Sequence, residues 1–453
     1  MNRKIIAFVF LVVSLSLLFF CTFTHTNSSS PTKYPQGLNI TSSDRILIVA
    51  PHPDDETIAT AGVIRYCVEN SIPVYVVVVT DGGSGQLGVT RYHESLNATG
   101  ILGLSGDNIT FFDYTQGLDS LFNENWDRSI NNYGNHTRDV FAYQQNASYD
   151  GVSLEKNMES VITDFQPTII IYPDPNDSNP DHWGTSSFVE YATNNLNYSG
   201  QMYTYLVHVS SVWPFPRGYF PDTYLLPPSF LENQNKWVVF PVNYADESID
   251  LSAINSYKSQ ISSDPTYLQS FIRKNELFIP NQQITVMKNN ESMDYIGGSR
   301  FPKTIFRDPI GDELIKPPLE VFYSTFSDLN LFDITDVGFE VDNNTAWMSL
   351  KTVGGISKTG IYHFRIRSFD DNNKRIDVQV QNGTAKYEIL SNNTLSKGQL
   401  EVKVKGNGIV IGIPSNLFTN TKYMISVDDM RNYETMRLGQ YLDRAGFYTF
   451  NLV

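Results

Sequence analysis

The stretch Val74–Thr80 reads VYVVVVT and is apolar at almost every position, not only at every second one. A strand of this kind is buried on both faces, so it belongs in a parallel sheet that helices cover on both sides. Further short apolar runs, which we read as strands, lie at 45–50, 109–112 and 168–172. Segments with helical spacing lie between them at 56–70, 90–102 and 154–165. Short strands that alternate with helices predict a doubly wound α/β domain with a mostly parallel, Rossmann-like sheet.

The pattern changes in the second half of the chain. A strand at 202–209 and a helix at 254–268 are expected first, and the amino-acid composition changes after about residue 302. From residue 319 to 453, apolar residues recur at every second position in short runs that Gly and Asn separate, which predicts a β-sandwich. We therefore expect an α/β domain at 44–301, a linker at 302–318 and a C-terminal β-sandwich domain at 319–453.

The N-terminus carries the marks of export. Arg3 and Lys4 precede an apolar run, Ile5–Phe23, which is close to the roughly 20 residues that span a bilayer. Residues 1–25 are thus either a secretory signal peptide or an uncleaved membrane anchor, and 26–43 form a linker. The basic side stays in the cytoplasm, so the rest of the chain is expected outside, membrane-anchored or secreted. Many N-x-[ST] sequons agree with an extracellular glycoprotein.

Charge and cysteine content exclude two classes of protein. The formal net charge is −15, and an acidic surface repels phosphate backbones, so nucleic acid is not an expected partner. The chain has only two cysteines, which excludes a disulfide framework.

Two polar clusters follow predicted strands. The first, after residues 45–50, is Pro51-His52-Pro53-Asp54-Asp55-Glu56; the second, after 168–172, runs from Asp177 to His182. Loops at the carboxyl ends of parallel strands can converge on one point. Two imidazoles, from His52 and His182, and the Asp55 carboxylate are a typical set of catalytic zinc ligands. Asp54 is then free to act as general base, although an acidic run at this place is also typical of a simple helix cap.

These motifs resemble the PIG-L (LmbE-like) N-acetylglucosaminyl deacetylase family. The resemblance rests on His52-Pro53-Asp54-Asp55-Glu56, on Pro180-Asp181-His182, and on Arg91 and Glu94 in an R-x-x-E pattern, and it covers about residues 44–300. It implies that Zn²⁺ is bound by His52, Asp55 and His182, and that Asp54 activates water. It also implies that Arg91 holds the substrate and that Asp181 orients a catalytic group.

The chain departs from the family pattern at one position. Many members have a His two residues before the Asp of the second motif, where it stabilises the oxyanion, but this chain has Asn179. An amide can donate a hydrogen bond to an oxyanion but carries no positive charge. His208, which follows the predicted strand near 202, is a candidate for the missing role.

The favoured function is an exported zinc-dependent hydrolase that deacetylates an N-acetylglucosamine-type sugar or glycan. One alternative is a catalytically impaired cell-surface protein that keeps the fold and binds carbohydrate. Another is a dinucleotide-binding protein, because Gly83–Gly88 matches G-x-G-x-x-G and Asp113 ends the next strand. That fingerprint normally follows the first strand, whereas here it follows the second.

Overall fold

A computed structural model describes most of the chain. The described residues are 37–83, 85–130, 141–209, 213–232, 236–262, 264–311, 329–369, 374–391, 394–431 and 443–453. The signal or anchor at 1–25 and most of the linker at 26–43 lie outside them. In the part of the chain that is described, no helix is long and apolar enough to cross a membrane.

The N-terminal half is built on a seven-stranded mixed sheet with the order β3-β2-β1-β4-β5-β7-β6. Its strands are β1 Ile46–Ala50, β2 Val74–Thr80, β3 Ile109–Tyr114, β4 Ile169–Pro173, β5 Gln201–Tyr205, β6 Val238–Pro241 and β7 Asn275–Pro280. Strands β1 to β5 pair in parallel, as expected, while β7 runs antiparallel to both β5 and β6. From β1 the chain first adds β2 and β3 on one side of the sheet and then adds β4 and β5 on the other side. Open α/β sheets place their sites at such a switch point, which here lies between β1 and β4.

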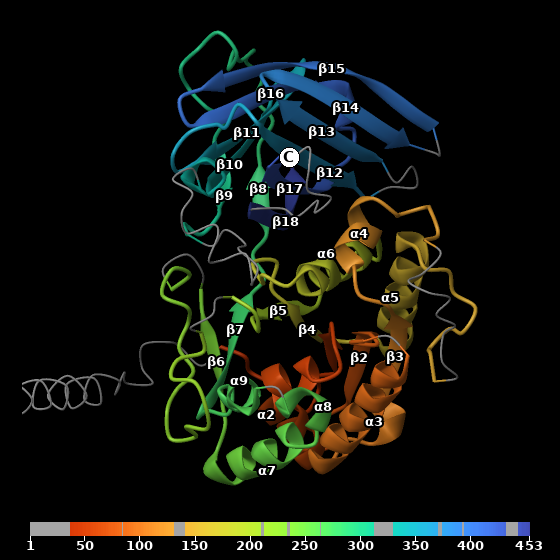
Figure 1. Ribbon diagram of the computed structural model, residues 1–453. Helices are drawn as coiled ribbons and strands as arrows, with labels where there is room; N and C mark the ends of the chain where they lie inside the picture. The colour runs from red at the N-terminus through yellow and green to blue at the C-terminus, as the bar shows by residue number, and fades with distance from the viewer. Residues whose placement is uncertain are drawn as a thin grey trace, which may run out of the picture.

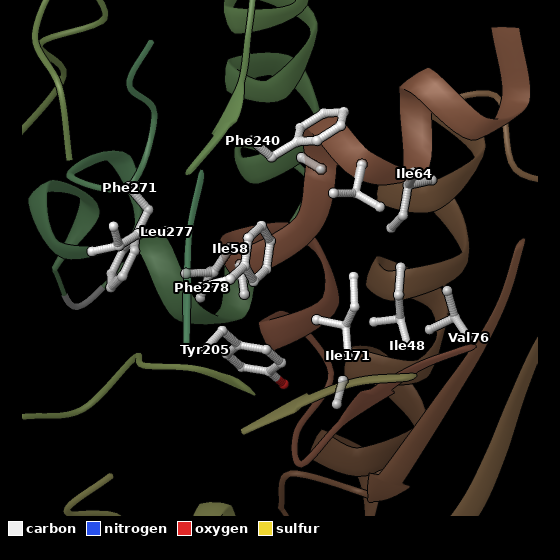
Figure 2. Close-up of a cluster of buried hydrophobic side chains, with 14 of the residues drawn as sticks. Ile48, Ile58, Ile64, Val76, Ile171, Tyr205, Phe240, Phe271, Leu277 and Phe278 are labelled. Carbon is white, nitrogen blue, oxygen red and sulfur yellow. The ribbon is translucent and has the colours of Figure 1, made fainter. Parts of the chain in front are cut away.

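Helices cover both faces of this sheet (Figure 1). They are α2 Asp55–Glu69, α3 Gln86–Ile101, α4 Leu118–Asn123, α5 Gly151–Phe165, α6 Pro180–Asn195, α7 Tyr244–Ile254, α8 Lys258–Ile261 and α9 Pro265–Gln269. Ile48 and Val76 pack with Ile58 and Ile64 of α2 on one face (Figure 2). On the other face, Leu47 packs among residues of α4, α5 and α6. The helix expected at 254–268 is wrong, because Pro265 and the polar residues before it divide that segment among three short helices.

The C-terminal part is rich in strands. An eleven-stranded sheet has the order β8-β18-β17-β12-β13-β14-β15-β16-β11-β10-β9. Its strands are β8 Ile284–Val286, β9 Thr304–Arg307, β10 Ile334–Val341, β11 Thr345–Thr352, β12 Gly360–Ser368, β13 Arg375–Gln381, β14 Thr384–Ser391, β15 Thr394–Lys405, β16 Gly408–Pro414, β17 Lys422–Arg431 and β18 Asp443–Leu452. Hydrogen bonds join these strands in one series, so the expected sandwich of two separate sheets remains a prediction. β8 and β9 precede residue 319, so strands of this sheet begin earlier than the expected boundary.

The two halves of the molecule share buried surface. Met424 of β17 and Phe447 of β18 belong to the same hydrophobic cluster as α4, α5 and α6, and the Phe447 and Phe122 rings lie 4.9 Å apart. The guanidinium of Arg444 lies 4.0 Å from the ring centre of Trp183, next to the predicted metal ligand His182. The strand-rich part therefore supports the helix that carries one half of the candidate site.

Candidate metal centre and active site

The first polar cluster forms a tight turn between β1 and α2. Asp54 lies in this turn with a φ of 150°, a conformation that non-glycine residues rarely adopt. Its backbone carbonyl accepts hydrogen bonds from Thr57 and Ile58, and its N–H donates to Glu56 Oε2 at 3.0 Å. The Asp54 side chain makes no helix-capping hydrogen bond. The strained backbone is thus fixed by its surroundings, and the carboxylate is left for another role.

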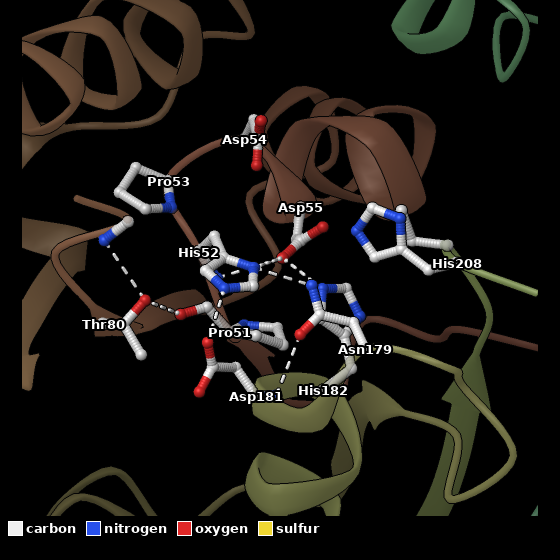
Figure 3. A network of polar contacts seen from close by, with 12 residues as sticks. Pro51, His52, Pro53, Asp54, Asp55, Thr80, Asn179, Asp181, His182 and His208 are labelled. Atoms are coloured by element: carbon white, nitrogen blue, oxygen red, sulfur yellow. Dashed lines mark hydrogen bonds and ion pairs between the residues drawn. The ribbon is translucent and has the colours of Figure 1, made fainter. Parts of the chain in front are cut away.

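The two strand-end clusters converge as the sequence predicts. His52 Nδ1, Asp55 Oδ2 and His182 Nε2 form a triangle of atoms with separations of 3.1–3.2 Å (Figure 3). All three side chains are buried. Zinc ligands about 2.0–2.1 Å from a tetrahedral metal lie roughly 3.3–3.4 Å from one another, close to these separations. The donor atoms and their spacing therefore fit a divalent metal ion.

Two carboxylates orient the imidazoles toward this point. Asp181 Oδ2 lies 3.1 Å from His52 Nε2, and its Oδ1 accepts from the backbone N–H groups of Gly117 and Leu118. Asp177 Oδ2 lies 3.1 Å from His182 Nδ1. With their outer nitrogens facing carboxylates, both rings turn the other nitrogen toward Asp55. Carboxylate–histidine pairs of this kind support metal ligands.

The electrostatics of the cluster favour positive charge at its centre. Burial lowers the pKa of His52, but contacts with Asp181 and Asp55 outweigh burial and raise it to about 9. The pKa of His182 is likewise raised well above its ordinary value by Asp177 and Asp55, against the effect of burial. Burial would raise the pKa of Asp55, yet the two imidazoles hold it well below its ordinary value. Protons on the imidazoles or a metal cation would supply this positive charge.

Asp54 lies apart from the ligand triangle and has a different environment (Figure 3). Its Oδ2 is 3.1 Å from Arg91 Nη2. Burial raises the pKa of Asp54 to about 7, although the Arg91 cation lowers it. A carboxylate with a pKa near neutrality suits general acid–base catalysis.

Arg91 is engaged by the protein itself. Its guanidinium is buried and donates from Nη1 to Gly82 O and from Nη2 to Pro53 O. These contacts join Arg91 to the turn that contains Asp54. Glu94, the partner in the R-x-x-E pattern, accepts from the backbone N–H and hydroxyl of Ser259 and so fixes α8.

Asn179 and His208 both lie beside the candidate metal ligand His182. Asn179 caps α6, with its Oδ1 accepting from the Asp181 N–H at 2.9 Å, which leaves its Nδ2 as a donor. The His208 ring centre is 4.7 Å from that of His182. Tyr267 donates its hydroxyl proton to Val207 O and therefore accepts from His208 Nδ1, so His208 Nε2 is an acceptor. Burial and the nearby His182 lower the pKa of His208 to about 4, which keeps this imidazole neutral.

The glycine-rich loop of the dinucleotide alternative follows β2, not the first strand β1. A Cβ on Gly88 would lie 2.6 Å from Gly83 O, and a Cβ on Gly82 would lie 2.6 Å from Arg91 Nη1. Close packing therefore accounts for Gly88 of the fingerprint, and for Gly82 directly before it, without a bound nucleotide.

Sequence reasoning assigned no role to Asp177 or Glu56. Besides facing His182, Asp177 accepts from the backbone N–H groups of Asn179, Val207 and His208. Glu56 accepts from Ser95, Tyr257 and the Asp54 N–H. The position of Asp177 four residues after the end of β4 was a signal for the first role. Ser95 and Tyr257, the side chains that donate to Glu56, come from distant segments and leave no local pattern.

Part of the chain is similar to known proteins. Residues 47–193 match the family model described as PIG-L: GlcNAc-PI de-N-acetylase. No curated protein matches the chain. Solved structures that show similarity include the zinc-inhibited form of teicoplanin deacetylase Orf2, with 17% identity over 52% of this chain and 97% of that chain and a TM-score of 0.36.

Two further structures are similar at the same level. The N,N'-diacetylchitobiose deacetylase from Pyrococcus horikoshii has 16% identity over 57% of this chain and 91% of that chain, with a TM-score of 0.34. The conserved protein TT1542 from Thermus thermophilus has 16% identity over 57% of this chain and 99% of that chain, with a TM-score of 0.35. Over residues 47–193, which hold the turn with Asp54 and the loop with His182, the chain matches the PIG-L (GlcNAc-PI de-N-acetylase) family, as its motifs implied.

Proposed function

We propose that this protein is an exported zinc-dependent hydrolase that removes the acetyl group from an N-acetylated sugar or glycan. The observation that carries the proposal is the convergence of His52 Nδ1, Asp55 Oδ2 and His182 Nε2 within 3.2 Å of one another. The match of residues 47–193 to a de-N-acetylase family supports the reaction type. Export is supported by the apolar segment Ile5–Phe23 after Arg3 and Lys4.

The residues around this point have separate tasks. Zinc held by His52, Asp55 and His182 would supply a Lewis acid that polarises the amide carbonyl. Asp54 takes a proton from the attacking water and returns it to the leaving amine, for which a pKa of about 7 is well suited. Asp181 holds the His52 ring in place and so acts as a positioning residue.

The oxyanion that forms during amide hydrolysis needs a hydrogen-bond donor. We assign this role first to Asn179, because its Nδ2 is a donor without any change of protonation. His208 would have to gain a proton before its Nε2 could donate, and its lowered pKa opposes this. Arg91 supports Asp54, and contact between Arg91 and the substrate would require the guanidinium to leave its present partners.

A non-catalytic carbohydrate-binding protein is the second candidate, and Asn179 is the observation that favours it. A neutral amide in place of a histidine lowers the capacity to stabilise negative charge. The two candidates differ in whether acetate is released.

The test compares two adjacent substitutions in the full-length protein. Metal content is measured by mass spectrometry, and acetate release is measured with a simple N-acetylglucosamine compound. Asp54→Asn should retain about one zinc per chain and lose about 10²–10⁴-fold in rate, the usual effect of removing a general base. Asp55→Asn should lose zinc, because a neutral amide is a poorer ligand than a carboxylate.

Each other pattern has a definite meaning. If the unaltered protein binds zinc and releases no acetate, the carbohydrate-binding candidate is favoured. If both variants keep zinc and full activity, the turn is only a helix start and the catalytic proposal is wrong.

A further inference from the structure

A pocket of about 610 Å³ lies away from the candidate active site, between the end of α4 and the strand-rich part. Figure 1 shows α4 beneath the ends of β12 and β13. Side chains alternate across a strand, so Phe364 and Ile366 of β12 enter the hydrophobic core of the strand-rich part while Arg365 and Arg367, both buried, lie on the opposite face of the sheet. Arg375 and Asp377, their partners on β13, lie on this same face. The pocket is lined by Arg365, Arg375 and Asp377 of this face and by Asn123, Glu124, Trp126 and Asp127 at the end of α4 and after it.

Four buried polar atoms in the residues that line this pocket lack a hydrogen-bond partner. One of them, Asp377 Oδ1, lies 2.9 Å from Arg367 Nη2 in an ion pair, and the other three are Arg375 Nη1, Trp126 Nε1 and Asn123 Oδ1. Arg375 and Trp126 are each 3% exposed, and Asn123 is 8% exposed. Native structures leave few buried polar groups unpaired, and a bound ligand or water usually accounts for those that remain. Two donors and one acceptor at one pocket therefore indicate a binding site.

Arg375 also differs from the other arginines of this face because they have carboxylate partners in the described part of the chain and it does not. Arg365 pairs with Asp428, and Arg367 Nη2 lies 2.9 Å from Asp377 Oδ1. Among the described residues, Arg375 forms no ion pair. Its Nη2 donates to Phe122 O, and its guanidinium stacks 4.5 Å from the ring centre of Trp126.

Burial, reinforced by the neighbouring Arg367, holds the pKa of Arg375 well below its ordinary value. Arg375 is thus a buried cation without an ion-pair partner of its own among the described residues, although the carboxylates of Glu124, Asp127, Asp377 and Glu388 also belong to residues that line the pocket. Such a cation is strongly stabilised by an anion that reaches its free N–H groups.

We propose that this pocket binds a small oxyanion, namely a carboxylate, phosphate or sulfate group, through Arg375 Nη1 and Trp126 Nε1. Asn123 Oδ1 accepts a hydrogen bond from a hydroxyl of the same ligand, so the class that fits best is an acidic sugar. A volume of about 610 Å³ lies within the usual range for small-ligand sites. The site is separate from the proposed zinc centre and does not depend on hydrolase activity.

The test is isothermal titration of the full-length protein with glucuronate, inorganic phosphate, inorganic sulfate and neutral glucose. Glucuronate should bind and glucose should not. Arg375→Gln should weaken glucuronate binding about 10- to 100-fold, the usual effect of losing a hydrogen bond to a charged group. Arg307→Gln is the matched control, because it removes the same charge from an exposed side chain outside this pocket and should leave affinity unchanged.

Trp126→Phe keeps the stacked ring, removes only the Nε1 donor, and provides a second test if Arg375→Gln does not fold. It should also weaken glucuronate. Binding of phosphate or sulfate that depends on Arg375, without binding of glucuronate, would support an oxyanion site whose ligand is the free ion. The proposal is overturned if none of the three anions binds, if both arginine variants lose affinity equally, or if neither Arg375→Gln nor Trp126→Phe changes it.

Discussion

The ion pair between Arg91 and Asp54 should set the acidic limit of activity. At 3.1 Å, opposite charges attract by about 5 kcal/mol at an effective dielectric constant of 20, which is an upper bound because the guanidinium is itself desolvated. Measured effects of a neighbouring arginine on an aspartate are about 1–3 pKa units. Arg91→Gln removes the cation, so the pKa of Asp54 should rise from about 7 to roughly 8–10.

The size of the effect follows from the fraction of Asp54 that is ionised. At pH 7 this fraction falls from about one half to between a tenth and a thousandth, so kcat/KM should fall about 5- to 500-fold. Activity should return as the pH is raised, because a general base acts in its ionised form. A metal ion bound at the ligand triangle would lower the Asp54 pKa in both proteins, so the shift of the acidic limb between the two proteins is the quantity to compare, and the fall in kcat/KM at pH 7 would be smaller.

The assay is the pH profile of kcat/KM for acetate release by the unaltered protein, Arg91→Gln and Arg91→Lys. Lysine keeps the charge and should leave the acidic limb near its original place, even though the forked contacts to Gly82 and Pro53 are lost. If Arg91→Gln raises KM and leaves the acidic limb unmoved, Arg91 holds the substrate, as the family resemblance implied, and the reasoning above is refuted.

Two further predictions concern support of the site and of the fold. Asp177→Asn should lower the affinity for zinc about 10- to 100-fold in a competition titration, because the His182 ring loses the carboxylate that orients it. Asp174→Asn is the control, because Asp174 lies three residues earlier and does not contact a candidate ligand, so zinc affinity should not change. Equal losses of affinity in the two variants would mean that the loop as a whole, and not the Asp177 carboxylate, supports the site. Phe447→Ala should lower the free energy of unfolding by about 3–5 kcal/mol in one cooperative denaturant transition, because Phe447 lies in the core shared by both halves. Two transitions, with only one of them shifted, would show instead that the strand-rich part is an independent unit.

The sequence predicted the central strands of the fold accurately where side chains face apolar surroundings on both sides. The predicted strand at 74–80 coincides with β2, and the predicted strand at 45–50 differs from β1 by one residue. Strands with other surroundings were missed. β7, for example, reads Asn-Glu-Leu-Phe-Ile-Pro, and its buried Glu276 is stabilised by the N–H groups of Gly62 and Val63. A polar residue that is buried through contacts with a distant helix gives no periodic signal.

In the candidate site, too, the sequence predicted the residues whose position has a local cause and missed the contacts that depend on distant segments. His52, Asp55 and His182 could be selected because each stands where a strand ends, and parallel strands bring such ends together. The environment of Arg91 could not be predicted in this way, since its acceptors are backbone carbonyls of two different loops. Donor and acceptor geometry of this kind depends on loop conformation, which residue types alone do not determine.

The burial of helix α6 has a consequence for the behaviour of the protein without the proposed zinc ion. Thirteen of its 16 residues are buried, and it lies among α4, α5 and the strand-rich part, so it has almost no face toward solvent. Amide hydrogens in such an element exchange only through openings that approach global unfolding in free energy. His182, in the first turn of α6, should therefore keep its place when the ion is removed by a chelator. Metal exchange would then proceed on a rigid apo-protein, and repeated stripping and reloading should leave the slowest-exchanging amides unchanged.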